Sequence, residues 1–407
     1  MSAGAKVLYL VDGLGLSGKT KAMVDLIAGL EPGRFSASVV SFDSLDSEET
    51  VLDQRLRGLG VAVQRIPCPD GVNLGVVARL GNLVRRLRPD VIHCYNPRTM
   101  LYGGIVARLG RVRAVLGTLS AFACLTPDGN YPFLPQKLFS ASPRNRLRNR
   151  AVSWLMRVIV TVSPSLGRGF CRYNGIDERR LRVVPYGVDL ARFAAVTADQ
   201  AAAFRARHGL APDAVVVGSV GRLVEQKDYP TQLRAFALAA ARHPDAVMLL
   251  VGDGPLRGEL EALARSLGIA ERVRFAGHSA EIPEALRAMD VYVMASKFEP
   301  YGVALLEAKA AGTAIVATRV NEIGEILGEG EPGGALGVLV PPADPAAMAD
   351  AFVALAGDGA RRRELGARAS RDAAVRHSLP AAIATYQNLY DELRGVTAKE
   401  VGVSPAL

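Results

Sequence analysis

The segment 296–318, SKFEPYGVALLEAKAAGTAIVAT, follows the apolar run DVYVMA and itself ends in a second apolar run, AIVAT. Short apolar runs of this kind are typical of buried parallel strands. Between the two runs, the sequence predicts a turn that contains Gly302 and then a helix. A strand, a helix and a second strand in this order indicate an α/β protein with a parallel sheet.

The same alternation of short apolar runs and longer amphipathic stretches extends along the whole chain. In the first half, the predicted strands are KVLYLV, ASVVSF, VAVQRI, DVIHC, AVLGT and VIVTVS. In the second half they are AVVVGSV, AVMLLVGD, RVRFAG, DVYVMA, AIVAT and GVLV. The helix-period stretches include 73–88, 228–243, 255–268 and 345–356. Two such sets of strands predict two doubly wound α/β domains.

Proline and glycine interrupt the pattern at residues 183–189, VVPYGVD, which predicts a domain boundary there. We expect a first domain over residues 1–182 and a second over 183–377. A last helix at about 378–395 is expected to cross back onto the first domain. Its expected packing residues are Tyr386, Leu389 and Tyr390. Ligands of doubly wound sheets bind at the carboxyl ends of the strands.

The composition is that of a globular protein, with 49% apolar and 22% charged residues among 407. The apolar runs are shorter than the roughly 18 residues that a membrane span needs. The N-terminus, MSAGAK, leads almost directly into a predicted strand, so no signal peptide is expected. The four cysteines are dispersed, as in reduced cytosolic proteins, and so are the five histidines. We therefore expect a cytoplasmic protein without a metal site.

The net charge of +9 comes almost wholly from arginine, which suits contacts with anions. No nucleic-acid-binding motif is present, so nucleic acid is not an expected partner. Residues 120–157 hold four aromatic residues, then four arginines and a tryptophan. This stretch is either a flap over a bound substrate, a basic segment on a membrane surface, or a solvated helix packed on its domain. A membrane contact would be peripheral, on the inner face.

Two carboxylates in the opening segment, Glu299 and Glu307, are eight residues apart, on either side of Gly302. Glu299 is expected in the turn and Glu307 inside the helix that follows. Backbone N–H groups near Gly302 and Val303 lack partners at a helix start and suit a phosphate or a sugar oxygen. Paired carboxylates also occur in glycosidases, which is the competing interpretation of this segment alone.

Two predicted loops at the carboxyl end of the second sheet carry groups that suit a diphosphate. Arg222 and Lys227 follow the run AVVVGSV and place two cations beside a helix N-terminus. Gly252 and Gly254 follow the next strand, and glycines let a ligand approach the backbone closely. A solvated loop with two surface charges is the structural alternative for Arg222 and Lys227.

Residues 10–20, LVDGLGLSGKT, match the P-loop pattern from Gly13 to Thr20, between a strand and a helix. In a P-loop, backbone N–H groups and a lysine hold nucleotide phosphates. No convincing strand with a magnesium-binding aspartate follows in the same domain. A P-loop NTPase is therefore an alternative function and not the preferred one.

The chain resembles the retaining glycosyltransferases of family 4, which have the GT-B fold of two Rossmann-like domains facing across a cleft. The resemblance rests on VGRLVEQKDYPTQLRAF, VGDGPLRGELE, FAGH, FEPYGVALLEAKAAG and ATRVNEIGEIL, in this order. It implies transfer of a sugar from a nucleotide-diphosphate sugar, with UDP favoured, to an acceptor hydroxyl. The donor would bind the second domain and the acceptor the first. Neither a metal nor another cofactor is implied.

The resemblance also implies roles for individual residues. Arg222 and Lys227 would grip the diphosphate and stabilise it as it leaves, and Glu299 would lie near the sugar hydroxyls. The remaining residues expected at the donor are Gly15, Gly252, Gly254, His278, Ile282, Tyr301, Gly302, Val303 and Glu307. Those expected near the acceptor or the sugar are Lys19, His93, Arg98 and Ser120.

Two departures from the family pattern stand out. Ser120, in GTLSAF, stands where the family often has a histidine near the donor sugar. RVNEIGEIL lacks the usual paired glycine and proline, although Glu325 matches. His93 either lines the cleft or packs at a strand end. A homologue that binds a nucleotide sugar without transferring it is a further alternative. The acceptor is a lipid carrier, a polysaccharide, a natural product or a small metabolite.

Overall fold

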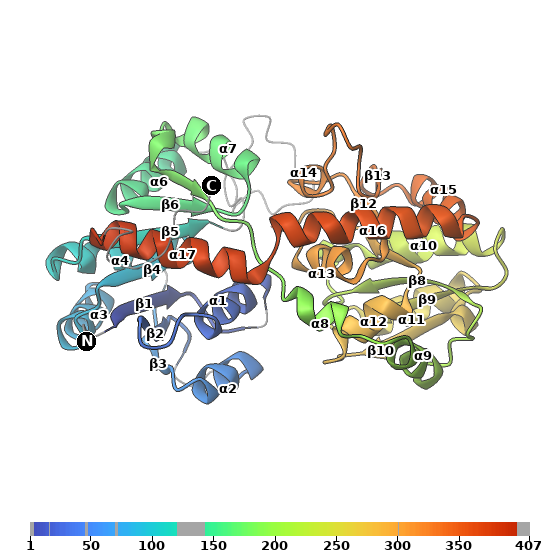
Figure 1. Ribbon diagram of the computed structural model, residues 1–407, viewed down its shortest axis with the longest axis horizontal. Coiled ribbons are helices and arrows are strands. Elements are labelled where there is room, and N and C mark those ends of the chain that lie inside the picture. The colour runs from blue at the N-terminus through green and yellow to red at the C-terminus, as the bar shows by residue number, and fades with distance from the viewer. Residues whose placement is uncertain are drawn as a thin grey trace. The chain divides into compact units, whose positions relative to one another are not determined.

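The computed structural model describes residues 4–15, 17–44, 48–69, 72–119, 143–299 and 301–396. They form two compact units (Figure 1). Unit 1 comprises the residues up to Gly187 together with those from Leu379 onward, and unit 2 comprises Val188–Ser378. The division falls after Gly187, whereas the sequence predicts a first domain that ends at residue 182.

Unit 1 contains a sheet of seven parallel strands in the order β3-β2-β1-β4-β5-β6-β7. The strands are β1 Ala5–Val11, β2 Phe35–Ser41, β3 Ala62–Arg65, β4 Val91–Cys94, β5 Ala114–Leu119, β6 Val158–Thr161 and β7 Leu181–Val183. Six of them overlap the predicted runs. The seventh, β7, was missed because it has only three residues and lies where the boundary was expected.

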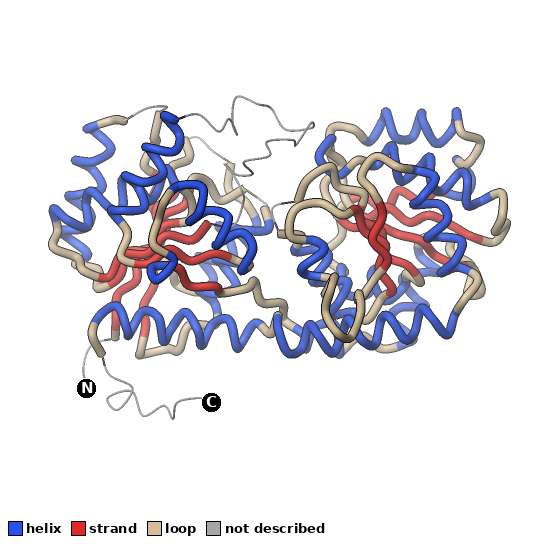
Figure 2. Tube along the Cα trace, turned by 90° about the horizontal axis from the view of Figure 1, so that it is seen from above, coloured by secondary structure: helices blue, strands red, loops and turns tan. Residues whose placement is uncertain are grey.

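Helices cover both faces of this sheet (Figure 2). They are α1 Gly18–Ala28, α2 Val51–Gly58, α3 Leu74–Leu87, α4 Pro97–Leu109, α6 Pro143–Leu155, α7 Pro164–Asn174 and α17 Leu379–Arg394. Two apolar cores result. One joins β1 to α1 and α17, and the other joins the opposite face of the sheet to α3 and α4.

Unit 2 contains six parallel strands in the order β10-β9-β8-β11-β12-β13. The strands are β8 Val215–Val220, β9 Ala246–Val251, β10 Val273–Gly277, β11 Val291–Met294, β12 Ala314–Thr318 and β13 Val338–Val340. All six contain predicted runs. The helices are α8 Leu190–Ala194, α9 Ala198–Arg207, α10 Tyr229–Ala240, α11 Arg257–Ser266, α12 Ile282–Ala288, α13 Val303–Ala311, α14 Ile323–Ile326, α15 Pro345–Ala356 and α16 Gly359–Arg376.

In both sheets the strand order reverses beside the first strand of the unit. The reversal lies between β1 and β4 in unit 1 and between β8 and β11 in unit 2. Loops that leave neighbouring strands at such a point diverge and leave room for a ligand at the carboxyl edge. Within each unit, the topology therefore directs attention to the loops after these four strands.

The last helix, α17, is part of the core of unit 1. Tyr386, Leu389 and Tyr390 are at most 5% exposed, which confirms them as packing residues. The Tyr390 hydroxyl bonds to the Tyr9 hydroxyl at 3.0 Å and to Nδ1 of His93 at 2.8 Å. The Thr118 hydroxyl bonds to Nε2 of His93 at 2.7 Å. His93 is fully buried, and burial lowers its pKa to about 3, so the imidazole is neutral.

His93 is therefore a core residue that ties β4 to β5 and α17, and it does not line an exposed pocket of unit 1. The packing interpretation of this histidine is the correct one. The strand pattern of DVIHC contains no sign of the partners, because they lie 25 and 297 residues further along the chain.

We expect Tyr390→Phe to lower the free energy of unfolding by about 1–3 kcal/mol, because it leaves a buried imidazole nitrogen and the Tyr9 hydroxyl without a partner. Chemical denaturation followed by circular dichroism measures the change. The matched control is Tyr173→Phe, at a half-buried ring whose hydroxyl makes no bond to the described residues. An equal effect of both substitutions would contradict the network.

Candidate functional site

The candidate residues of unit 2 lie at the carboxyl edge of its sheet, in the loops after β8, β9, β10 and β11 and in the helices that follow them. Lys227 follows β8 and Glu299 follows β11, on either side of the point where the strand order reverses. The loops after β9 and β12 flank them. The carboxyl ends of parallel strands share one edge of a sheet, so this unit gathers four loops at one place.

Lys227 and Glu299 form a partly buried ion pair. The ammonium group of Lys227 bonds to Oε2 of Glu299, and their side chains are 19% and 8% exposed. The Ser296 hydroxyl donates to the same carboxylate oxygen at 3.0 Å. A buried carboxylate needs such partners, because the loss of water is costly for an ion. The pair fixes one cation and one carboxylate at this edge of unit 2.

Further bonds join the three loops around the pair. The Gln226 side chain donates to the carbonyl of Phe298 at 3.1 Å, and the Lys297 N–H donates to the carbonyl of Gln226 at 2.9 Å. The Glu299 N–H donates to Oδ1 of Asn321, after β12, at 3.0 Å. The backbone around Glu299 is thus held from both neighbouring loops.

The turn before α13 is built around a glycine. Gly302 has a φ of 78°, in the left-handed region, and a Cβ there would lie 3.2 Å from Ile323 and 3.4 Å from Glu299. Gly302 is the residue before α13 and has no side chain to cap the first N–H groups of that helix. Such groups suit an anionic or sugar oxygen. Tyr301 is 3% exposed and Glu307, one turn into α13, is 8% exposed.

The helix that carries Glu307 is anchored from behind. Lys309, fully buried, forms an ion pair with Asp372 of α16 and donates to the carbonyl of Ile326 at 2.8 Å. The remaining expected residues of unit 2 are more open. Arg222 and His278 are exposed and Ile282 is half-buried. Arg222 forms no ion pair with a described carboxylate, so its charge is available.

The glycines after β9 have a packing role in addition to the expected one. A Cβ at Gly252 would lie 2.0 Å from the carbonyl oxygen of Gly221, and one at Gly254 would lie 2.5 Å from that of Leu223. The space that glycine leaves open is filled by the backbone of the loop after β8. These glycines let two loops pack backbone to backbone and so position Arg222. Their contact with a ligand stays a prediction.

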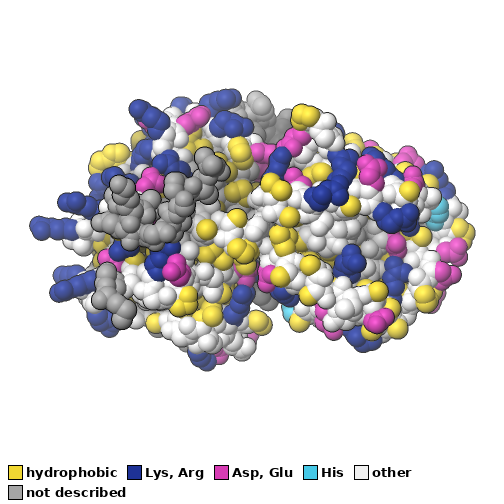
Figure 3. Space-filling view, in the orientation of Figure 1, with side chains coloured by type: hydrophobic (Ala, Val, Ile, Leu, Met, Phe, Trp, Pro, Cys, Tyr) yellow, Lys and Arg dark blue, Asp and Glu magenta, His cyan; other side chains and the backbone are white. Residues whose placement is uncertain are grey.

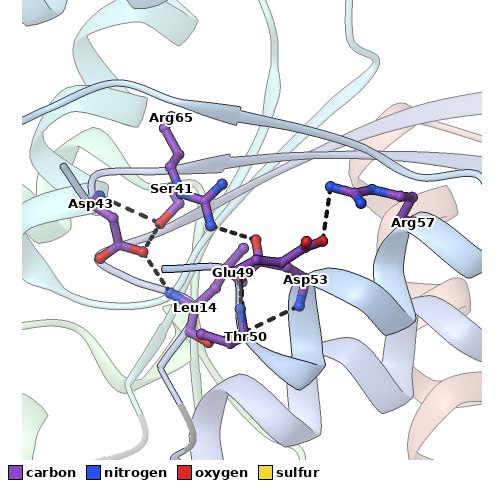
Figure 4. A network of polar contacts seen from close by, with 8 residues as sticks. All are labelled: Leu14, Ser41, Asp43, Glu49, Thr50, Asp53, Arg57 and Arg65. Atoms are coloured by element: carbon purple, nitrogen blue, oxygen red, sulfur yellow. Dashed lines mark hydrogen bonds and ion pairs between the residues drawn. The ribbon is translucent and has the colours of Figure 1, made fainter. Parts of the chain in front are cut away.

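In unit 1, the loop that matches the P-loop pattern is held by side chains (Figure 4). The N–H of Leu14 donates to Asp43 at 2.9 Å, and the Thr50 hydroxyl donates to the carbonyl of Leu14 at 3.0 Å. The Thr20 hydroxyl, which would bind magnesium in a P-loop, donates to the carbonyl of Gly15 at 2.7 Å. An aspartate thus occupies an N–H that a P-loop offers to phosphate.

The network in Figure 4 continues from Thr50 to the start of α2. Asp53 accepts from the Thr50 N–H at 3.0 Å and from Arg65 at 2.6 Å. Lys19 is half-buried, and a Cβ at Gly15 would meet no atom within 4 Å. The loop therefore remains open at Gly15, while its base is fixed.

One other candidate of unit 1 lies near the start of that loop, and another lies outside the described residues. Arg98, exposed at the start of α4, donates to the carbonyl of Cys68 at 3.4 Å. Burial raises the pKa of Asp12, while the nearby cations Lys19 and Arg98 oppose this shift. Ser120 and the first four aromatic residues of the stretch 120–157 lie outside the described residues, whereas Trp154 is described.

One residue was missed. Glu322, after β12, is 7% exposed, and its Oε2 has no hydrogen-bond partner among the described residues. Burial raises the pKa of Glu322 to about 7, and the nearby Glu325 adds to this shift. Its neighbours Asn321 and Ile323 contact Glu299 and Gly302. The signal was the unusual RVNEIGEIL stretch, where only Glu325 was singled out.

Among the described residues, no three His, Cys, Asp or Glu side chains gather as metal ligands do. The described helices include none that is long and apolar enough to span a membrane.

Comparison with known proteins assigns both halves of the chain. Residues 200–372 match the family model "Glycosyl transferases group 1", and residues 17–192 match "Glycosyltransferase Family 4". A lipopolysaccharide core biosynthesis glycosyltransferase of Rhizobium meliloti, LpsE, is 35% identical over 206 residues, which is 49% of this chain and 56% of the relative. The chain thus matches about half of the length of this relative.

A longer match and a solved structure extend the comparison. The 2-deoxystreptamine N-acetyl-D-glucosaminyltransferase of Streptomyces fradiae is 29% identical over 341 residues, 77% of either chain. The crystal structure of Anabaena HepE in complex with UDP superposes with a TM-score of 0.79 at 20% identity, over 95% of this chain and 100% of that one. The fold of this chain is the GT-B fold.

The raised pKa of Glu322 makes a prediction about pH. When the pKa of a carboxyl group is higher in the folded than in the unfolded state, the folded protein becomes less stable as the pH rises. Between pH 5 and pH 8, the ionised form of Glu322 should lower the free energy of unfolding by about 2–3 kcal/mol. Glu322→Gln removes this loss, so the free energy of unfolding of the variant should increase relative to that of the wild type as the pH rises. Urea unfolding at several pH values measures it.

The control for this prediction is Glu259→Gln, at an exposed carboxylate of α11. The free energy of unfolding of this control should differ from that of the wild type by the same amount at every pH. If Glu322→Gln also follows the wild type at every pH, Glu322 ionises normally and the assignment is wrong.

Proposed function

Because the chain belongs to the glycosyltransferases of group 1 and family 4, we propose that it transfers a sugar from a nucleotide-diphosphate sugar to a hydroxyl group of an acceptor. The observation that carries this proposal is the partly buried pair of Lys227 and Glu299 at the carboxyl edge of unit 2, with Arg222, which has no ion pair with a described carboxylate, on the same loop as Lys227. UDP is the proposed nucleotide, since the similar HepE structure holds UDP.

We propose the following division of work. Breaking the bond between the anomeric carbon and the phosphate leaves negative charge on the diphosphate, and Lys227 and Arg222 stabilise that charge. Fixed charges in a partly dry site do so effectively because they need no reorganisation during the reaction. Glu299 accepts hydrogen bonds from sugar hydroxyls and keeps Lys227 in place. Glu307 contacts the ribose, and the N–H groups at Gly302 and Val303 face the phosphate.

The proposed transfer retains the anomeric configuration, with the departing phosphate oxygen taking the proton of the acceptor hydroxyl on the same face. No protein base is then needed. Two side-chain cations and helix-terminal N–H groups provide the positive charge, so we propose that neither a metal ion nor a cofactor takes part. The nucleotide sugar is a co-substrate.

The two alternative functions make different demands on the chain. A P-loop NTPase needs the Leu14 N–H and the Thr20 hydroxyl for phosphate and magnesium, and both groups already have protein partners. An inactive homologue that binds a nucleotide sugar would use the cation of Lys227 as the transferase does. The geometry therefore argues against the NTPase, and a transfer assay separates the transferase from an inactive homologue.

The acceptor remains a proposal at the level of chemical class. One similar protein acts in lipopolysaccharide core biosynthesis and another on 2-deoxystreptamine, so the relatives include enzymes for large and small acceptors. We propose a hydroxyl acceptor of either kind. We also propose that the chain makes peripheral contact with a membrane, which is where lipid-linked acceptors are found.

Donor binding can be tested by thermal shift with UDP, GDP, ADP, dTDP, their sugars, and ATP with magnesium. A ligand at 100 times its dissociation constant stabilises the folded protein by about 2.7 kcal/mol. We expect a shift with one diphosphate series, with UDP foremost, that disappears in Lys227→Ala. A shift with ATP and magnesium alone, lost in Lys19→Ala, would instead establish the P-loop.

Removal of the proposed leaving-group cation should slow the reaction strongly. We expect Lys227→Ala to lower kcat by about 10²–10³, as for other preorganised groups that stabilise transition-state charge. The rate at which the nucleotide diphosphate is released, during transfer or hydrolysis of the donor sugar, measures the change in kcat.

Lys297→Ala is the matched control. Lys297 joins the same two loops through Glu225 at 3.1 Å, but the side chain of Glu225 is 84% exposed. We expect less than a threefold change for this variant, in line with the small effect of surface ion pairs. Equal losses in both variants would mean that Lys227 only holds the loops together.

A further inference from the structure

We infer that unit 1 docks on anionic lipid bilayers through an arginine-rich surface at the amino edge of its sheet. This inference rests on the membrane contact proposed above and names its surface and its lipid. The arginine surface comprises the C-terminal ends of α3, α4 and α6 and the residues that follow them. Its members are Arg85, Arg86, Arg88, Arg108, Leu109, Arg111, Arg113, Trp154 and Arg157.

Topology brings these residues to one edge. Arg113 precedes β5 and Arg157 precedes β6, and these strands pair in parallel. Arg85 and Arg88 lie at the end of α3 and Arg111 just after α4, and together with Arg113 they line one hollow of about 570 Å³. Figure 3 shows Lys and Arg side chains along the left end of unit 1, where Figure 1 places α3 and α4.

The charge of this surface is not balanced by the protein. All seven arginines are exposed, and none forms an ion pair with a described carboxylate. Asp90 lines the hollow, and one of its carboxylate oxygens accepts from the Lys6 N–H at 2.8 Å. Elsewhere in the chain, arginines such as Arg34 and Arg205 do pair with aspartates. Uncompensated guanidinium groups favour an anionic partner, and they match phosphate groups well.

Apolar side chains at the same place favour a bilayer over other anionic partners. Leu109 is 71% exposed and Trp154 is 65% exposed. The guanidinium carbon of Arg108 lies 3.8 Å from the centre of the Trp154 ring, and Arg108 donates to the carbonyl of Trp154 at 3.1 Å. Tryptophan beside arginine suits the boundary between headgroups and acyl chains. Nucleic acid would use the arginines but not Leu109.

The position of the surface is compatible with catalysis. The amino edge of the sheet is opposite the carboxyl edge, where the loops after β1 and β4 emerge. Docking through the arginine surface therefore leaves the loop of Gly15 and the start of α4 uncovered within unit 1. A membrane-bound unit 1 would keep its proposed acceptor side accessible.

The chain offers a built-in probe, because Trp154 is its only tryptophan. The full chain is mixed with vesicles of phosphatidylglycerol and phosphatidylcholine, or of phosphatidylcholine alone, and tryptophan emission and co-sedimentation are measured. We expect a blue shift and sedimentation with the anionic vesicles only, and release at high salt.

Charge removal tests the surface itself. Arg85→Gln, Arg111→Gln and Arg113→Gln together should weaken partitioning on the order of 100-fold, while Trp154 and Arg108 stay in place as the probe. The control removes the same charge from unit 2 through Arg265→Gln, Arg363→Gln and Arg371→Gln, at exposed residues without a described ion pair. It should bind nearly as the wild type does.

The outcomes separate the proposals. Sedimentation with unchanged Trp154 emission, or equal weakening in both triple variants, would place the membrane contact elsewhere. No sedimentation at all, or a Trp154 response to duplex DNA and not to vesicles, would overturn the lipid surface altogether. Thermal shift with UDP in the same samples reports the donor site of unit 2, so a failure of the transferase proposal is recognised separately.

Discussion

The ion pair between Lys227 and Glu299 joins the two loops that leave the sheet of unit 2 where its strand order reverses. A buried pair of charges contributes little to stability, because the loss of water offsets the attraction. Its value is positional: a lysine on a flexible side chain is held at one point by a carboxylate that is itself bonded to Ser296. The bonds from Gln226 and Asn321 hold the backbone around the carboxylate. A diphosphate that arrived at this edge would meet a cation already in place.

A second constraint lies under that pair. The loop after β8 can pass close to the loop after β9 only because Gly252 and Gly254 have no Cβ. The close approach allows the Leu223 N–H to bond to the carbonyl of Asp253 at 3.0 Å, which fixes the segment that carries Arg222. Glycine in a strand-to-helix turn thus serves either a ligand or a neighbouring backbone. The sequence does not distinguish these two uses, because a glycine at the same position suits both.

The sequence was sufficient for the α/β class, for the order of the strands along the chain and for the carboxyl-edge loops of unit 2. These features depend on short-range patterns, namely apolar runs, helical periods and breaks at glycine. It was insufficient wherever the deciding partner is distant along the chain. His93 bonds to Tyr390 and is therefore a core residue. The Leu14 N–H bonds to Asp43, so this N–H of the P-loop pattern already has a protein partner. Glu322 was overlooked because burial of a carboxyl group has no local signature in the sequence.

The net charge of +9 gains meaning once it is placed on the fold. In unit 2, Lys227 and the buried Lys309 each face a carboxylate, so their charges position loops and helices. The arginines at the amino edge of unit 1 form no ion pair with a described carboxylate, and their mutual repulsion opposes folding. Base composition alone would scatter arginine over the surface. A cluster beside an exposed tryptophan and leucine requires a different cause, and an anionic surface outside the protein provides one. In the proposed arrangement, the two edges of the sheet of unit 1 would serve different partners: the acceptor at the carboxyl edge and the bilayer at the amino edge.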